Sequence, residues 1–107
     1  MKQIVLAILF LVSTDSMANK ITTNQASNYV GKNATVCGII AEITTIRNDT
    51  FINIDSPHPY QKFYFYVNNQ TLGKQYLYKN VCGTGTVRSH KGKYQIKLTD
   101  IRSLSFR

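Results

Sequence analysis

The fold is decided by one strand-forming run, Thr35-Val36-Cys37-Gly38-Ile39-Ile40-Ala41-Glu42-Ile43. Its Val-Cys-Gly core returns later in the chain as Val81-Cys82-Gly83, and a Lys-Asn pair precedes each copy. Both segments are rich in β-branched residues, which favour strands, and both carry a glycine where a strand bends or bulges. They therefore predict two strands of similar shape, around which the rest of the chain is arranged.

The first of these strands is expected at residues 34–47, with a bend near its middle. Val36, Gly38 and Ile40 share one face by period-two alternation, whereas Ile43 falls on the other. A bulge or a sharp bend is needed to keep both apolar sets in the core. A long, bent first strand is typical of a small closed barrel.

Four further strands are predicted, at residues 50–55, 61–68, 80–89 and 93–98. Residues 56–59 hold two prolines and should form a loop, because proline cannot donate to a sheet. Residues 69–79 are expected to be a short helix or an irregular loop. The alternation of side chains over residues 101–106 predicts that the last strand continues past a kink.

The one helix predicted in the N-terminal part lies between Asn19 and Lys32. Thr22 or Thr23 can cap it and Gly31 can end it. Its apolar stripe would be Ala26, Tyr29 and Val30. So short a helix should serve to cover one end of the sheet.

Alternation also predicts which side chains face the core of the second and third strands. Ile52 and Ile54 should point inward, which leaves Phe51 on the outer face. In the third strand the phenylalanines should point inward. Tyr64 and Tyr66 should point outward, where each hydroxyl stays in contact with water.

The first eighteen residues have the pattern of a secretory signal peptide. They combine a basic start at Lys2, an apolar run over 4–12, and small residues at Ser16 and Ala18. That run is too short to cross a bilayer as a helix. We expect a leader at 1–18 and a single domain at 19–107, periplasmic or secreted, with no membrane span.

The chain is strongly basic. Thirteen lysines and arginines against five acidic residues give a net charge of +8. The basic residues are spread along the chain, which predicts a folded surface with a positive field. Such a surface suits a polyanionic ligand. A soluble basic protein of an envelope compartment is the alternative.

The two cysteines lie on the two matching strands. In an exported chain they most simply form one disulfide, Cys37 to Cys82. Two buried free thiols are the alternative. A metal site is not expected, because His58 and His90 lie at none of the usual ligand spacings relative to the cysteines.

Five strands of this kind, with a tight hairpin between the fourth and fifth, resemble an OB-fold, an all-β, five-stranded Greek-key barrel. More narrowly, the chain is similar to small bacterial exported OB-fold proteins of the nucleic-acid-binding type. The resemblance spans residues 26–104. Its matching pieces are Tyr29-Val30-Gly31-Lys32, Val36-Cys37-Gly38, Phe51-Ile52-Asn53-Ile54, Tyr60-Gln61-Lys62-Phe63, Val81-Cys82-Gly83-Thr84-Gly85 and Gly92-Lys93-Tyr94-Gln95-Ile96.

The resemblance implies binding of single-stranded nucleic acid, DNA or RNA, or of an oligosaccharide, across the face of strands two and three. On that face lie Phe51, Asn53, Tyr64 and Tyr66, and near its rim lie Arg47, Lys62, Arg88, Lys91 and Lys93. Aromatic rings stack on bases at about 1–3 kcal/mol each, and cations neutralise phosphates. Ordinary cross-strand packing is the alternative explanation of the exposed tyrosines.

Two functions remain open. One is a binding module for nucleic acid. The other is an envelope structural or interaction protein that contacts another protein or an anionic glycan. An enzyme is not expected, and neither is a cofactor, because the four carboxylates after the leader form no recognisable constellation and nucleophile motifs are absent. Those carboxylates are Glu42, Asp49, Asp55 and Asp100.

Overall fold

The computed structural model describes residues 19–107, so the leader predicted at 1–18 lies outside the described residues. Within that range the chain forms seven strands and three short 3-10 helices. In chain order these are β1 (Asn19–Thr22), η1 (Thr23–Tyr29), β2 (Asn33–Ile46), β3 (Asp49–Ile54), β4 (Phe63–Val67), η2 (Lys74–Tyr76), β5 (Asn80–His90), β6 (Lys93–Leu98), η3 (Ile101–Ser103) and β7 (Ser105–Phe106).

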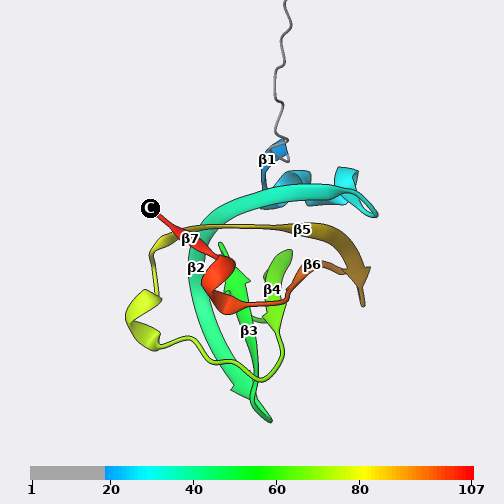
Figure 1. Ribbon diagram of the computed structural model, residues 1–107. Coiled ribbons are helices and arrows are strands. Elements are labelled where there is room, and N and C mark those ends of the chain that lie inside the picture. Colours follow the sequence, from blue (N-terminus) through cyan, green and yellow to red (C-terminus); the bar gives the residue numbers. More distant parts are fainter. Residues whose placement is uncertain (1–18) are drawn as a thin grey trace, which may run out of the picture.

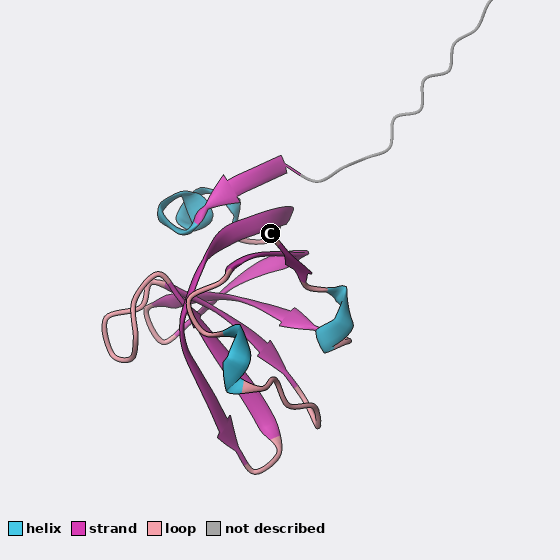
Figure 2. Ribbon diagram, turned by 90° about the vertical axis from the view of Figure 1, so that its left-hand side faces the viewer, coloured by secondary structure: helices cyan, strands magenta, loops and turns pink. Residues whose placement is uncertain are grey.

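Five of the strands close into a barrel (Figure 1). β2 pairs with β3, β3 with β4, β4 with β6, β6 with β5, and β5 returns to β2. The β4–β6 pairing is parallel and the other four are antiparallel. This is the connectivity of the five-stranded Greek-key OB-fold, so the predicted fold class is confirmed. Figures 1 and 2 place β1 and η1 at one end of the barrel and the β2–β3 hairpin at the other.

The bend predicted in the first barrel strand is a bulge in β2. The register with β3 shifts between Ile40 and Glu42, so that one extra residue stands in β2 at this point. Before the shift Val36 and Ile40 face the core, and after it Ile43 does. The extra residue therefore turns both apolar sets inward, which unbroken alternation would not allow.

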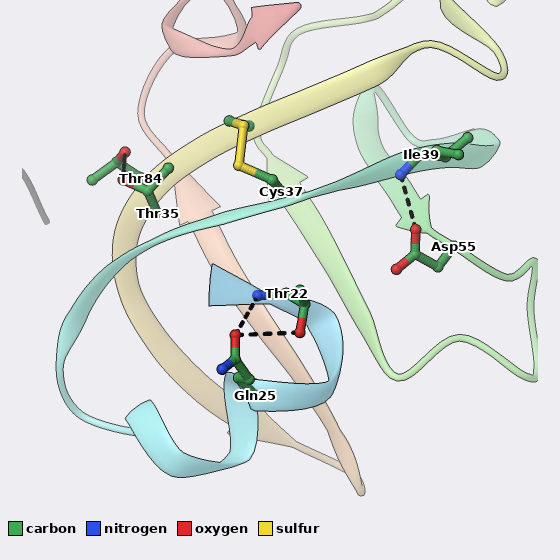
Figure 3. Close-up of a disulfide and its surroundings, with 8 residues drawn as sticks. Thr22, Gln25, Thr35, Cys37, Ile39, Asp55 and Thr84 are labelled. Atoms are coloured by element: carbon green, nitrogen blue, oxygen red, sulfur yellow. Dashed lines mark hydrogen bonds between the residues drawn. A yellow bond between two sulfur atoms is a disulfide. The ribbon is translucent and has the colours of Figure 1, made fainter. Parts of the chain in front are cut away.

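The two Val-Cys-Gly segments pair with each other in antiparallel register. Cys37 lies directly opposite Cys82, and the two form a disulfide with a Cα–Cα distance of 4.1 Å (Figure 3). Val36 faces Gly83, and Gly38 faces Val81. The predicted disulfide is present, and each buried valine lies across from a glycine.

These glycines are required by close packing. A Cβ on Gly83 would come within 2.6 Å of the Phe65 ring, and a Cβ on Gly38 would come within 2.3 Å of Ile54. Both distances are shorter than real carbon contacts, so any side chain at either position would force the core apart. The barrel can therefore close tightly around Phe65 only because these positions lack side chains.

Asp55 ties the end of β3 to β2 and η1. Its Oδ1 accepts a hydrogen bond of 2.9 Å from the Ile39 N–H, and its Oδ2 accepts one of 2.8 Å from the Thr23 hydroxyl (Figure 3 shows the first). Asp55 adopts a positive φ of 70°, which aspartate tolerates better than most residues. The carboxylate is therefore part of the structure that closes the barrel.

The core contains the side chains that alternation placed inward. Ile52 and Ile54 of β3 and Phe63, Phe65 and Val67 of β4 are all buried. The two phenylalanine rings meet edge to face with centroids 5.0 Å apart. The orientation predicted for these two strands is thus correct, and Phe51 and both tyrosines lie on the outer face.

Several predicted elements differ from the structure. Residues 19–22 form β1, a strand parallel to β2, and the helix that follows is a 3-10 helix in which Val30 takes no part and is 45% exposed. Residues 101–106 do not extend β6: they form η3 and then β7, which pairs with β5. Residues 69–79 are irregular around η2, as one of the two alternatives held.

The missed strands are short, four and two residues, and lie at the edges of the sheet. Their register depends on a neighbouring strand more than on their own sequence. Within residues 19–107, no helix has the length and hydropathy that crossing a membrane requires.

Candidate functional site

A groove of about 610 Å³ crosses the outer face of the barrel over β3 and β4. It lies between the last residues of β2 and the β5–β6 hairpin. Its lining residues are Glu42, Thr44, Ile46, Phe51, Asn53, His58, Gln61, Tyr64, His90, Lys91 and Lys93. The volume is within the range of ligand-binding clefts.

The rings of Phe51 and Tyr64 form one wall of the groove, and the Tyr66 ring lies next to Phe51 just outside it. Phe51 lies 5.9 Å from Tyr64 and 4.9 Å from Tyr66, measured between ring centroids. Phe51 and Tyr66 are direct cross-strand partners, so β3 and β4 hold these rings side by side. The ammonium of Lys97 stands 5.9 Å from the Tyr66 ring centroid.

Asp49 anchors Tyr66. Its Oδ2 accepts a hydrogen bond of 3.1 Å from the Tyr66 hydroxyl, and its Oδ1 accepts from the backbone N–H of Asn69 at 3.1 Å. The bond from Asn69 is the main cause of a lowered Asp49 pKa, with smaller contributions from Asn68 and Tyr66. The pKa of Tyr66 is raised, first by burial and then by its bond to Asp49. Tyr66 is therefore fixed in place by its hydroxyl.

Tyr64 faces outward but is largely covered by its neighbours. Only 7% of its surface is accessible, and burial is the main cause of a raised Tyr64 pKa, followed by the proximity of Tyr66. The expectation of an exposed outer ring therefore does not hold, since most of the Tyr64 side chain is covered. Alternation predicted the correct face, but the neighbouring residues of the groove cover the ring.

A chain of polar side chains forms the floor of the groove. Glu42 Oε1 accepts a hydrogen bond of 2.9 Å from Asn53 Nδ2 and one of 2.8 Å from the backbone N–H of His58. Asn53 Oδ1 accepts a bond of 3.0 Å from Gln61 Nε2, which also lies 3.3 Å from His58 Nδ1. The bonds from His58 and Asn53, in that order, lower the Glu42 pKa, so this carboxylate is ionised at neutral pH.

The ionised Glu42 carboxylate determines which atoms donate and which accept in this series of hydrogen bonds. An ionised carboxylate only accepts, so Asn53 must turn its NH₂ group toward Glu42 and its oxygen toward Gln61. Gln61 must then turn its NH₂ group toward Asn53. This leaves Gln61 Oε1 as a buried acceptor without a hydrogen-bond partner among the described residues, in a side chain that is only 5% exposed.

Of the predicted rim cations, Lys91 and Lys93 lie at the groove. Lys91 is exposed in the β5–β6 hairpin and adopts a positive φ of 51°. The Lys93 ammonium donates to the carbonyl oxygens of Pro59 and Gln61 at 2.8 and 2.9 Å. Lys93 therefore fastens the 59–61 loop to β6, a role that the sequence did not reveal.

The other three predicted cations are not among the lining residues of the groove. Arg47 is exposed in the β2–β3 turn, where its φ is 54°. Arg88 lines a separate hollow together with Lys97. The Lys62 ammonium donates to Asn24 Oδ1 of η1 at 3.1 Å. The groove thus brings together Phe51, Asn53, Tyr64, Lys91 and Lys93 from the predicted set, with Tyr66 beside them.

Sequence reasoning missed six lining residues: Glu42, Thr44, Ile46, His58, Gln61 and His90. For Glu42 and Thr44 a signal existed, since both follow the predicted bulge on the face opposite the buried Ile43. For His58 and Gln61 there was none, because their position depends on how the proline loop folds over β3. Among residues 19–107, no group of three or more histidines, cysteines and carboxylates is placed to hold a metal ion.

Fold and site together define an OB-fold barrel with a groove of aromatic and polar residues across its outer sheet face. No protein-family model matches the chain, and a search of curated proteins finds no match. Among solved structures, the chain is similar to a putative aspartyl-tRNA synthetase from Leishmania major Friedlin, with a TM-score of 0.57 and 9% sequence identity. The match covers 94% of this chain and 22% of that one, so the chain spans about a fifth of that protein's length. At this identity the likeness shows a shared fold.

Proposed function

We propose that this chain is a binding module for single-stranded nucleic acid, and that it holds bases in the groove over β3 and β4. The observation that carries the proposal is the ring cluster of Phe51, Tyr64 and Tyr66 on the face where the groove opens. Unpaired bases stack on such rings whatever their sequence. Double-stranded nucleic acid offers no free base face to them.

Charge supports the same ligand. The chain carries a net charge of +8, and Lys91 stands exposed where the groove meets the β5–β6 hairpin. A phosphate that leaves the groove at this side would meet the Lys91 ammonium. Such contacts displace counterions, so binding of this kind weakens as salt rises.

The fold comparison is consistent with this proposal. One protein with a similar fold is named as a putative aspartyl-tRNA synthetase, and the name implies an RNA substrate for that protein. At 9% identity this likeness adds weight to the fold and little to the ligand.

We also propose that the module acts by binding and not by catalysis. Three of its carboxylates make structural contacts in separate places. Glu42 holds Asn53, Asp49 holds Tyr66, and Asp55 holds Ile39. The fourth, Asp100, pairs with Arg102 of η3.

The place of action that we propose is an oxidising compartment reached by export. The disulfide between Cys37 and Cys82 supports it, because disulfides persist mainly outside the reducing cytosol. Sequencing the N-terminus of the protein recovered from the extracytoplasmic fraction of its source tests this part. A start at Asn19 is expected, and an intact Met1 start in the cytosolic fraction would contradict it.

Fluorescence anisotropy with a labelled single-stranded oligonucleotide of mixed sequence tests the main proposal. Binding should be clear at about 50 mM salt and much weaker at about 200 mM. Lys91→Ala should weaken it and reduce the salt slope by about 0.7, the value for one phosphate of a single strand. Lys20→Ala on β1, which does not line the groove, removes the same charge and should change little.

Two results would overturn the proposal: no binding at low salt, or equal losses from the two lysine variants. Capture of an anionic glycan or an envelope protein in place of the oligonucleotide would favour the interaction-protein alternative.

A further inference from the structure

We infer that the groove prefers guanine, which its Glu42 carboxylate recognises through the donor edge of the base. The inference rests on the proposed function, since it names the base that the same groove selects. It starts from the polar floor, where the free groups are acceptors.

Glu42 offers the groove one free carboxylate oxygen. Both hydrogen bonds to this side chain, from Asn53 Nδ2 and from the His58 N–H, end on Oε1. Oε2 receives none from residues 19–107, and Glu42 lines the groove. The two bonds hold the carboxylate in one orientation and lower its pKa, so it offers a fixed negative acceptor.

Gln61 Oε1 is a second acceptor without a hydrogen-bond partner among the described residues. Because of the hydrogen bonds that begin at Glu42, the NH₂ group of Gln61 must donate to Asn53 Oδ1, and it also lies next to His58 Nδ1. Its Oε1 is buried and lacks a donor among the described residues. Buried polar atoms are nearly always paired. This oxygen is not, and it adds partial negative charge to the floor, which favours a ligand edge made of donors.

Of the nucleic-acid bases, guanine matches such an acceptor best. Guanine presents two donors side by side, N1–H and the N2 amino group, and the free Glu42 Oε2, which has two lone pairs, can accept from both. Thymine and uracil offer one N–H between two carbonyl oxygens, which a carboxylate repels. Adenine and cytosine each place a ring acceptor beside their amino group.

The ring of the base would at the same time lie against Phe51, whose own ring stands 5.9 Å from Tyr64 in the groove wall. Stacking alone accepts any base. The acceptors of the floor therefore supply the selectivity, and the rings supply affinity that is common to all bases.

The test uses a labelled oligothymidylate in which one central base is dT, dC, dA, dI or dG, measured by fluorescence anisotropy at fixed salt. We expect dG to bind about tenfold tighter than dT, within the range for one good bidentate pair. Inosine lacks the N2 amino group, so dI should lose most of that gain. A larger ring alone cannot explain a difference between dG and dI.

The matched protein variant is Glu42→Gln. Its amide oxygen can still accept from Asn53 and His58, while its NH₂ group replaces the free acceptor by a donor. The dG advantage over dT should disappear, because the amide offers thymine a donor and no longer repels its carbonyl oxygens. A melting curve equal to that of the wild type shows that the fold is kept, and Lys91→Ala should weaken every oligonucleotide by the same factor.

The outcomes separate the two claims. Equal binding of all five oligonucleotides, equal binding of dG and dI, or a dG preference that survives in Glu42→Gln overturns the guanine inference and leaves the proposed function standing. Failure of every oligonucleotide to bind the wild type at low salt overturns the proposed function, and the inference with it.

Discussion

Phe51 lies directly opposite Tyr66 across the β3–β4 pairing, with ring centroids 4.9 Å apart and the Tyr66 hydroxyl held by Asp49. This arrangement fixes an aromatic surface before any ligand arrives. Preorganised rings lose little conformational freedom on binding, so stacking contributes more of its energy to affinity.

Removing the Phe51 ring should therefore weaken single-strand binding. Phe51→Ala is expected to cost about 1–3 kcal/mol in affinity, the usual value for one stacked base. Phe51→Leu restores apolar bulk without a flat ring and should recover stability but not affinity. Anisotropy and thermal melting of both variants check this, and unchanged affinity in both would show that Phe51 is a packing residue only.

Tyr64 should matter for stability as well as for binding. Because 93% of its surface is covered, Tyr64→Ala leaves a cavity and should cost about 3 kcal/mol in unfolding free energy. Tyr64→Phe keeps the ring and should cost less than about 1 kcal/mol. Phe63→Ala, in the core, is the reference variant and should lower the unfolding free energy by about 3–5 kcal/mol. Chemical denaturation measures all three, and a Tyr64→Ala variant as stable as the wild type would contradict the observed burial.

The disulfide should carry a large share of the stability. Cys37 and Cys82 are 45 residues apart in sequence, and closing a loop of that size is worth about 3–4 kcal/mol in the chain-entropy model. The unreduced protein should be about 2 Da lighter than the reduced one, as two thiol hydrogens are lost. Reduction should lower the melting temperature, whereas the double variant with alanine at both positions should not respond to reductant. Two free thiols in the unreduced protein would rule the bridge out.

Acid stability should depend in part on Asp100. Bonds from the Arg102 side chain and backbone N–H lower the Asp100 pKa to about 2, from an ordinary value of 3.8. A carboxyl with a lower pKa in the folded state stabilises the fold above its unfolded pKa, and this contribution is lost as the pH falls from about 3.8 through about 2. The pair is exposed, so its effect on stability is small.

A carboxyl NMR titration checks this directly. Arg102→Ala should move the Asp100 midpoint back toward its ordinary value and leave that of Asp49 lowered, because Asp49 is held by the Asn69 N–H. An Asp100 midpoint that does not move would show that Arg102 is not its main partner.

The sequence predicted the barrel because its signals are local. Ile40 and Ile43 fall on opposite faces of a regular strand, so a bulge is needed to bury both, and β2 has that bulge. The matched cysteines required two neighbouring strands, and they pair directly. By contrast, β7 has only two residues, and they form a strand because they pair with β5. No pattern in two residues could have predicted it.

The site was only partly predictable for a different reason. Alternation tells which face Phe51, Asn53 and Tyr64 occupy, but not what covers them. The proline loop brings His58 and Gln61 over Asn53, and Lys93 fastens that loop to β6. These contacts join residues that are far apart along the strands, so only the folded chain reveals them.

We propose above all that single-stranded nucleic acid binds in the groove over β3 and β4. The most direct measurement is a titration of the ¹⁵N-labelled protein with a single-stranded oligonucleotide, followed by backbone amide NMR shifts. We predict that the largest shifts fall at Thr44, Phe51, Tyr64 and His90, with little change at β1 and β7. Shifts that gather around β1 and η1, or no shifts at low salt, would contradict the claim.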